Sequence, residues 1–277
     1  MCCALSAIPL GALGQFASGV TLVEVYATVV DERGAPVPGL RADDFELEQD
    51  GRRQQVQTFS AGDVPLSLAI AVDRSFSLSR DRLTAAVDAA ARLLGELRPD
   101  DRVTVLAIGS QVDVLAPLSV DHRAAHDALL GLERWGTTPL FDATVAALDA
   151  VQQAPGRRAL ILLTDGDDRY SGATAGEMVA AARRHDVLIY PVVLRRTPSS
   201  VLAQLAGVTG GRSFAVADLR TLPEVLSAIA TELRRQYLLG YAPPGGDAED
   251  PGWHSITVRV TRPTLRVRAR DGYYGVR

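Results

Sequence analysis

The sequence has little cysteine, few aromatic residues and no long apolar run in its interior, and each shortage excludes something. Its two cysteines, Cys2 and Cys3, are adjacent, so we expect neither a disulfide framework nor a Cys/His zinc site. Beyond the N-terminal stretch no eighteen consecutive residues are apolar, which predicts no transmembrane helix in the mature chain. Aromatic residues make up 5% of the chain, so the core must consist mainly of Ala, Val, Leu and Ile.

Clustered positive charge is also missing. The chain has 29 Lys and Arg residues against 33 Asp and Glu residues, a formal net charge of −4, and the two signs are interspersed. A nucleic-acid-binding face needs grouped Lys and Arg, so nucleic acid is excluded as the main partner. With 277 residues, 47% of them hydrophobic, the chain is long enough to bury a sizeable core.

The first residues form a small, apolar and uncharged segment. Residues 1–19 resemble the apolar region of a secretory signal, and Ala17-Ser18-Gly19 is a small-residue stretch suited to cleavage, but a basic start is missing. The alternatives are a truncated signal peptide and a disordered N-terminus. The first predicts an exported protein in the periplasm, at the cell surface or secreted, and a cytoplasmic location stays open.

The rest of the chain divides into a β block (20–62), an α/β block (64–235) and a second β block (236–277). In the α/β block, apolar runs alternate with amphipathic stretches, a pattern typical of a doubly wound, mostly parallel sheet. The expected strands are 66–72, 102–108, 159–163 and 187–193, with a short edge strand at 111–115. The expected helices are 80–97, 121–133, 140–154, 174–185, 199–207 and 222–236.

Neither β block has enough strands for a stable sheet of its own. In the first, Asp50-Gly51 predicts a hairpin between 45–48 and 54–59. In the second, 237–241 precedes a Pro/Gly-rich loop, and 254–261 and 264–269 alternate around Arg262-Pro263. We expect the two blocks to pair into one small β-sandwich, with the α/β domain inserted between them. Two independent β appendages are the alternative.

Three polar motifs follow the ends of expected strands or precede a helix in the α/β block. The first is Asp73-Arg74-Ser75-Phe76-Ser77, directly after the strand 66–72. Alternate residues of an extended segment point the same way, so Asp73, Ser75 and Ser77 can converge. The alternative is that these serines cap the following helix.

The second and third motifs each place a polar side chain at the start of an expected helix or after an expected strand. Thr138 precedes Pro139, which is typical of a helix N-cap, although its hydroxyl can instead face the first motif. Asp165 follows the apolar run 159–163 after Thr164 and precedes Gly166, and an Asp-Gly pair is also typical of a surface turn. Ligands of doubly wound sheets bind outside the carboxyl ends of the strands, where all three motifs are expected.

Taken together, the motifs supply two carboxylates and three hydroxyls to one rim. Such oxygen ligands suit Mg²⁺, Ca²⁺ or Mn²⁺. D-x-S-x-S, T-P-L-x-D-A and L-L-T-D-G, in this order, resemble the metal-ion-dependent adhesion site (MIDAS) of von Willebrand factor A domains. The resemblance implies one metal held by Asp73, Ser75, Ser77, Thr138 and Asp165. The hydroxyls would bind directly and the two acids often through water.

The outer blocks sharpen this resemblance. The segment 30–40, Asp44-Phe45 and Asp50-Gly51, with 236–241 and 271–274 at the other end, are similar to a bacterial, acidobacterial-type family of von Willebrand A-related proteins. Members of that family are generally exported. The implied function is metal-dependent adhesion or protein binding, in which a partner's acidic side chain completes the metal's coordination shell.

Two other functions are alternatives to metal-dependent protein binding. One is a structural or assembly module of a cell-envelope complex in which the metal is incidental. The other is a Mg²⁺-dependent hydrolase, but a phosphatase of the haloacid dehalogenase type needs a second Asp where Ser75 stands, and neither G-x-S-x-G nor a phosphate-binding loop is present. We therefore expect no enzyme and no catalytic residues. The sequence does not indicate the oligomeric state.

Overall fold

A computed structural model describes residues 22–62, 64–243 and 251–275, and the expected leader at 1–19 lies outside them. Its centre is a twisted sheet with the strand order β10-β9-β8-β5-β6-β7, parallel except for the antiparallel edge strand β7. The strands are β5 (Leu66–Asp73), β6 (Arg102–Ile108), β7 (Val112–Ser119), β8 (Arg157–Thr164), β9 (Leu188–Val193) and β10 (Phe214–Ala215).

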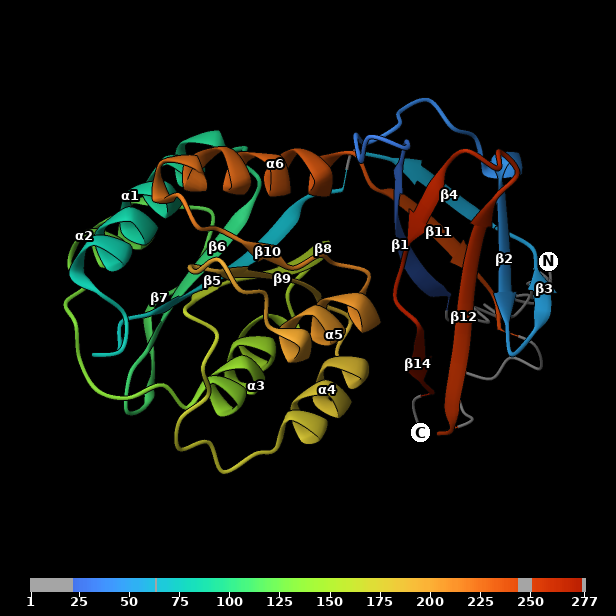
Figure 1. Cartoon of the computed structure of the whole chain (residues 1–277). Coiled ribbons are helices and arrows are strands. Elements are labelled where there is room, and N and C mark those ends of the chain that lie inside the picture. The colour runs from blue at the N-terminus through green and yellow to red at the C-terminus, as the bar shows by residue number, and fades with distance from the viewer. Residues whose placement is uncertain (1–21, 63, 244–250, 276–277) are drawn as a thin grey trace, which may run out of the picture.

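Helices cover both faces of this sheet (Figure 1). One face packs against α1 (Arg80–Glu96), α2 (Arg123–Leu130) and α6 (Leu222–Arg234), and the other against α3 (Leu140–Val151), α4 (Ala175–Arg184) and α5 (Ser200–Thr209). The central strand β5 is buried along its whole length. Its larger side chains, such as Ile70, face the α1 side, and Ala69 and Ala71 face the α3 side. Burial on both faces explains why the strand is apolar from Leu68 to Val72 rather than alternating.

The N- and C-terminal segments together form a β-sandwich in the described residues. One sheet has the order β13-β1-β11-β4 and the other β14-β12-β2-β3, so each contains strands from both ends of the chain. The strands are β1 (Val23–Val30), β2 (Phe45–Gln49), β3 (Arg52–Gln54), β4 (Thr58–Ala61), β11 (Tyr237–Tyr241), β12 (Trp253–Val260), β13 (Arg266–Arg268) and β14 (Gly272–Tyr274). Their shared core, which includes Val25, Phe45, Leu47 and Leu239, confirms the predicted fold class.

One strand pairing differs from the predicted one, and two successive C-terminal strands lie in different sheets. The hairpin partner of β2 is β3 rather than 54–59, because Asp50 (φ 51°) and Gly51 (φ 73°) make a two-residue turn and the strand resumes at once. Residues 58–61 instead cross to the other sheet and pair with β11. The segments on either side of Arg262-Pro263 also separate, since β12 pairs with β2 and β13 pairs with β1.

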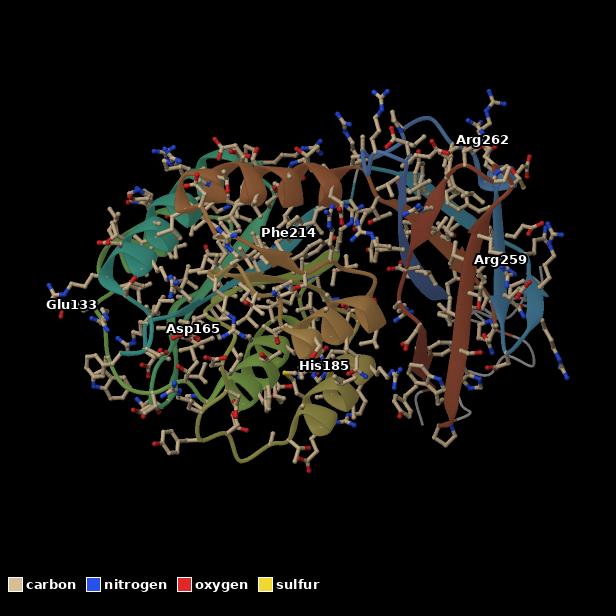
Figure 2. All side chains as sticks on the ribbon, in the orientation of Figure 1. Glu133, Asp165, His185, Phe214, Arg259 and Arg262 are labelled. Atoms are coloured by element: carbon tan, nitrogen blue, oxygen red, sulfur yellow. The ribbon has the colours of Figure 1, made fainter. Side chains whose placement is uncertain are left out.

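The sandwich adjoins the amino ends of the parallel strands. Arg157, the first residue of β8, lies with its guanidinium 5.0 Å from the ring centroid of Tyr26 in β1. Gln236, which follows α6, donates to the hydroxyl of Thr28 at 2.9 Å. The carboxyl ends of the strands therefore point away from the sandwich. In Figure 2, Asp165 lies in the α/β part, whereas Arg259 and Arg262 lie in the sandwich at the opposite end.

Candidate metal centre

The first motif begins at the carboxyl end of β5. Asp73 is wholly buried, and its Oδ1 accepts the backbone N–H of Ser75 at 2.9 Å. This short turn brings the hydroxyl oxygens of Ser75 and Ser77 to 2.9 Å from each other. Helix α1 is capped by Ser79, which accepts from the backbone N–H of Arg82. The capping alternative is therefore wrong for Ser75 and Ser77, whose hydroxyls are available for another role.

The second motif presents Thr138 to the first. Its Oγ1 lies 3.5 Å from the Ser77 hydroxyl, and the residue is wholly buried. The N-cap position of α3 is Pro139, with no capping side chain, so the interpretation of Thr138 as an N-cap is also wrong. Gly136 makes this approach possible: its φ is +79°, and a Cβ there would lie 2.3 Å from the backbone nitrogen of Ser110.

Backbone hydrogen bonds join the three loops. Trp135 donates to the carbonyl of Arg74 at 2.7 Å, and Phe76 donates to that of Gly136 at 3.0 Å. From the third loop, Arg169 donates to the carbonyl of Thr138 at 2.7 Å. Because these contacts are between main-chain atoms, the rim is held in place independently of its exposed side chains.

The third motif places Asp165 directly after β8. Asp165 is 6% exposed, so it is not the surface turn that its Asp-Gly sequence also suggested. Its Oδ1 accepts the backbone N–H of Asp167 at 3.2 Å, and Gly166 turns the chain with φ +85°. Its negative charge acts on Asp73, so the two carboxylates belong to one electrostatic environment.

Sequence reasoning missed Thr164. This buried residue ends β8, and its hydroxyl donates to Oδ2 of Asp73 at 3.0 Å while accepting the backbone N–H of Gly166 at 3.0 Å. It therefore orients Asp73 and fixes the turn that carries Asp165. The available signal was a polar residue at the end of an otherwise apolar strand, next to an acid.

The two carboxylates lack a cationic partner. Burial raises the pKa of Asp73 above its ordinary value, hydrogen bonds from Ser75 and Thr164 lower it in part, and the negative charge of Asp165 raises it further. In the described part of the chain, neither Asp73 nor Asp165 forms an ion pair. The nearby arginines Arg74 and Arg195 instead pair with Asp113 and Asp167, each at 2.6 Å.

The donor set fits a hard divalent cation. It offers two buried carboxylates and three hydroxyls, all oxygen ligands. Within the described ranges no three His, Cys, Asp or Glu side chains are grouped so as to hold a metal, which leaves hydroxyls as essential donors. A hollow of about 320 Å³, lined partly by Ser75, Ser77 and Thr138, opens the hydroxyl side to solvent.

Comparison with known proteins agrees with this reading of the fold. Residues 68–167 match the family model of the von Willebrand factor type A domain. This part of the chain is therefore similar to the von Willebrand factor type A domain, which confirms the broad resemblance. No curated protein matches the chain. Its narrower similarity to the bacterial von Willebrand A-related family stays a prediction.

Solved structures share the fold at low sequence identity. A von Willebrand factor type A protein from Catenulispora acidiphila is 16% identical, over 85% of this chain and 63% of that one, with a TM-score of 0.55. An aerotolerance-related membrane protein from Bacteroides fragilis is 20% identical, over 61% and 98%, with a TM-score of 0.50. Proximal thread matrix protein 1 from the mussel byssus, with a zinc-occupied MIDAS motif, is 14% identical, over 62% and 48%, with a TM-score of 0.51. Among the described helices of this chain, none is long and apolar enough to cross a membrane.

Proposed function

We propose that this chain is a divalent-cation-dependent protein-binding module. The observation that carries the proposal is a pair of buried carboxylates, Asp73 and Asp165, that have no cationic partner among the described residues, the charge of Asp165 acting on Asp73. Burying two like charges without compensation is unfavourable. A bound cation would remove that penalty.

Mg²⁺, Ca²⁺ or Mn²⁺ is the proposed cation. Ser75, Ser77 and Thr138 would hold it through their hydroxyls, with Asp73 and Asp165 placed to act through water. Because these direct donors are neutral, the bound cation would keep much of its positive charge and attract a carboxylate. The mussel protein with its zinc-occupied MIDAS motif supports a metal here, so zinc belongs in the test.

The partner is proposed to offer a Glu or Asp side chain. The hollow beside Ser77 and Thr138 leaves room for such a group to approach. Backbone contacts between the loops keep this approach open without requiring the partner to order them first. The proposal assigns binding to the site and no chemical step.

Titration calorimetry with Mg²⁺, Ca²⁺, Mn²⁺ and Zn²⁺ tests the proposal. The wild-type chain should bind at least one of these ions with one-to-one stoichiometry, and Asp73→Ala should lose that binding. Asp88→Asn is the matched control, since Asp88 is an exposed acid of α1 away from the rim. Retention of binding by Asp73→Ala at wild-type affinity, with the variant folded by circular dichroism, would refute the assignment.

A further inference from the structure

Two neighbouring hollows meet at one exposed side chain. Phe76 lines both the 320 Å³ hollow of the candidate metal centre, here called the ion hollow, and a second hollow of about 440 Å³. The second, here called the arginine hollow, lies beside the start of α1 and is lined by Arg80, Arg134 and Leu83 among others. Phe76 is 63% exposed and forms the ridge between them.

The arginine hollow carries positive charge that the described residues do not neutralise. Arg80 is exposed and has no side-chain partner among them. At the first position of α1 a cation is disfavoured by the helix dipole, so helix stability does not explain Arg80. Arg134 donates from Nη2 to the carbonyl of Phe76 at 2.5 Å, and its Nε is buried without a partner in the described structure.

One acid, Glu133, also lines this hollow. It is exposed, and Figure 2 shows it at the outer edge of the molecule. Its solvated charge offsets one of the two arginine charges, so the lining keeps a net charge of +1 from Arg80, Arg134 and Glu133. The hollow thus has an excess of positive charge in a chain whose net charge is −4.

Exposed aromatic side chains gather at the same rim. Of the large aromatics that are well exposed in the described residues, Phe76, Trp135 and Tyr170 lie here and Tyr274 lies in the sandwich. Tyr170 is 83% exposed, and its backbone has φ +71°, a conformation that costs free energy for a non-glycine residue. Exposed aromatics next to arginines are typical of protein-binding surfaces.

We propose that the partner is an acidic protein segment that supplies two carboxylates rather than one. The first enters the ion hollow, and the second lies between Arg80 and Arg134 in the arginine hollow, with the segment crossing Phe76. This inference rests on the proposed function, because the first carboxylate is the one attracted by the cation. Guanidinium groups bind carboxylates with paired, charge-assisted hydrogen bonds, which suits the second position.

The arrangement favours a peptide over an anionic membrane. Two separate hollows divided by a ridge match successive side chains of an extended segment. An anionic membrane attracts clusters of about four to eight basic residues, whereas this hollow offers Arg80 and Arg134 beside Glu133. Vesicles containing phosphatidylserine therefore serve as the competing probe.

The test uses fluorescence anisotropy with synthetic peptides containing two glutamates at varied spacing, and matched peptides in which the second glutamate is glutamine. With Mg²⁺, one spacing should bind best, and replacing its second glutamate should weaken binding by about fivefold, the upper range for an exposed ion pair. In Arg80→Gln the difference between the two peptides should fall well below fivefold, because one of the two guanidinium groups that distinguish them is gone and only Arg134 remains. Arg92→Gln, an exposed position of the same helix outside the hollow, should retain the fivefold difference.

The outcomes separate the two proposals. If no peptide binds in a Mg²⁺-dependent way, the proposed function and this inference both fail. If binding needs Mg²⁺ but the glutamate and glutamine peptides bind alike in the wild type, only the second carboxylate is refuted. An equal loss in Arg80→Gln and Arg92→Gln, or binding of the vesicles in place of the peptides, also overturns this inference.

Discussion

Two wholly buried aspartates, Asp101 and Asp73, lie at opposite ends of the central sheet, and they differ in whether a cationic side chain contacts them. Asp101, beside the start of β6, accepts hydrogen bonds from the backbone N–H groups of Leu66 and Arg98 and from Nη2 of Arg234 at 2.6 Å. Asp73, at the far end of β5, accepts hydrogen bonds from the backbone N–H of Ser75 and from the hydroxyl of Thr164. Both are hydrogen-bonded, but only Asp101 has a cation.

Their pKa values move in opposite directions. Burial alone raises the pKa of Asp101, but the hydrogen bonds from Arg234 and from the backbone of Arg98 and Leu66 outweigh it and lower the pKa below its ordinary value. For Asp73 burial is not outweighed, and the nearby charge of Asp165 adds to it, so its pKa is raised. A buried acid with a cation of its own is part of the scaffold. A buried acid without one indicates where a cation from solution is expected.

Asp101→Ala should show the largest effect, a loss of about 3 kcal/mol in the free energy of unfolding at neutral pH. The change leaves the Arg234 guanidinium and two backbone N–H groups without their acceptor. Urea unfolding followed by circular dichroism measures it, with and without Mg²⁺. The neighbouring exposed acid gives a matched control, since Asp100→Ala should change stability by less than about 0.5 kcal/mol. A loss of stability that Mg²⁺ reverses would mean that Asp101 takes part in metal binding, as Asp73 is proposed to do.

Asp73→Asn should have the opposite sign in metal-free protein, a gain of about 1 kcal/mol in the free energy of unfolding. The variant removes one of two like charges that are buried without compensation. With Mg²⁺ at a hundred times its dissociation constant the order should reverse, because the wild type gains about 2.7 kcal/mol and the variant does not.

Unfolding in EDTA and in Mg²⁺ provides both values, with Asp88→Asn as the surface control. If metal-free Asp73→Asn proves less stable than wild type, the hydrogen bonds from Ser75 and Thr164 outweigh the buried charge. The contrast with Asp101 would then be lost.

Local sequence patterns predicted much of the fold and of the candidate centre. The strand at 66–72 was predictable because burial on both faces requires a nearly continuous apolar run, which only Ser67 interrupts here. Asp73, Ser75 and Ser77 were predictable because strand, acid and hydroxyls follow one another within a few residues. Thr138 and Asp165 needed the rule that the carboxyl ends of parallel strands share one rim.

What failed depended on contacts between distant residues. Arg234 and Asp101 are separated by 133 positions, and nothing local to either indicates that they pair. Residues 58–61 and β11 are also far apart in the sequence. The Asp-Gly turn predicts a hairpin but not that residues 58–61 pair with a strand of the other sheet. Apolar alternation fixes which face of a strand is buried, but not which neighbour it joins.

The pH dependence of stability should separate Asp101 from Asp73 by a smaller change in the free energy of unfolding. Because the folded pKa of Asp101 is depressed, its stabilising contribution is complete above the ordinary value of 3.8 and is lost as the pH falls through the lower, folded pKa. The difference in unfolding free energy between wild type and Asp101→Ala should therefore be constant near neutrality and shrink only below that value. Urea unfolding from neutral pH to below 3.8, with Asp100→Ala as the control, measures this difference in unfolding free energy. A difference that already shrinks well above 3.8 would mean that the Arg234 contact does not hold this carboxylate in its charged form, and Asp101 would then resemble Asp73 after all.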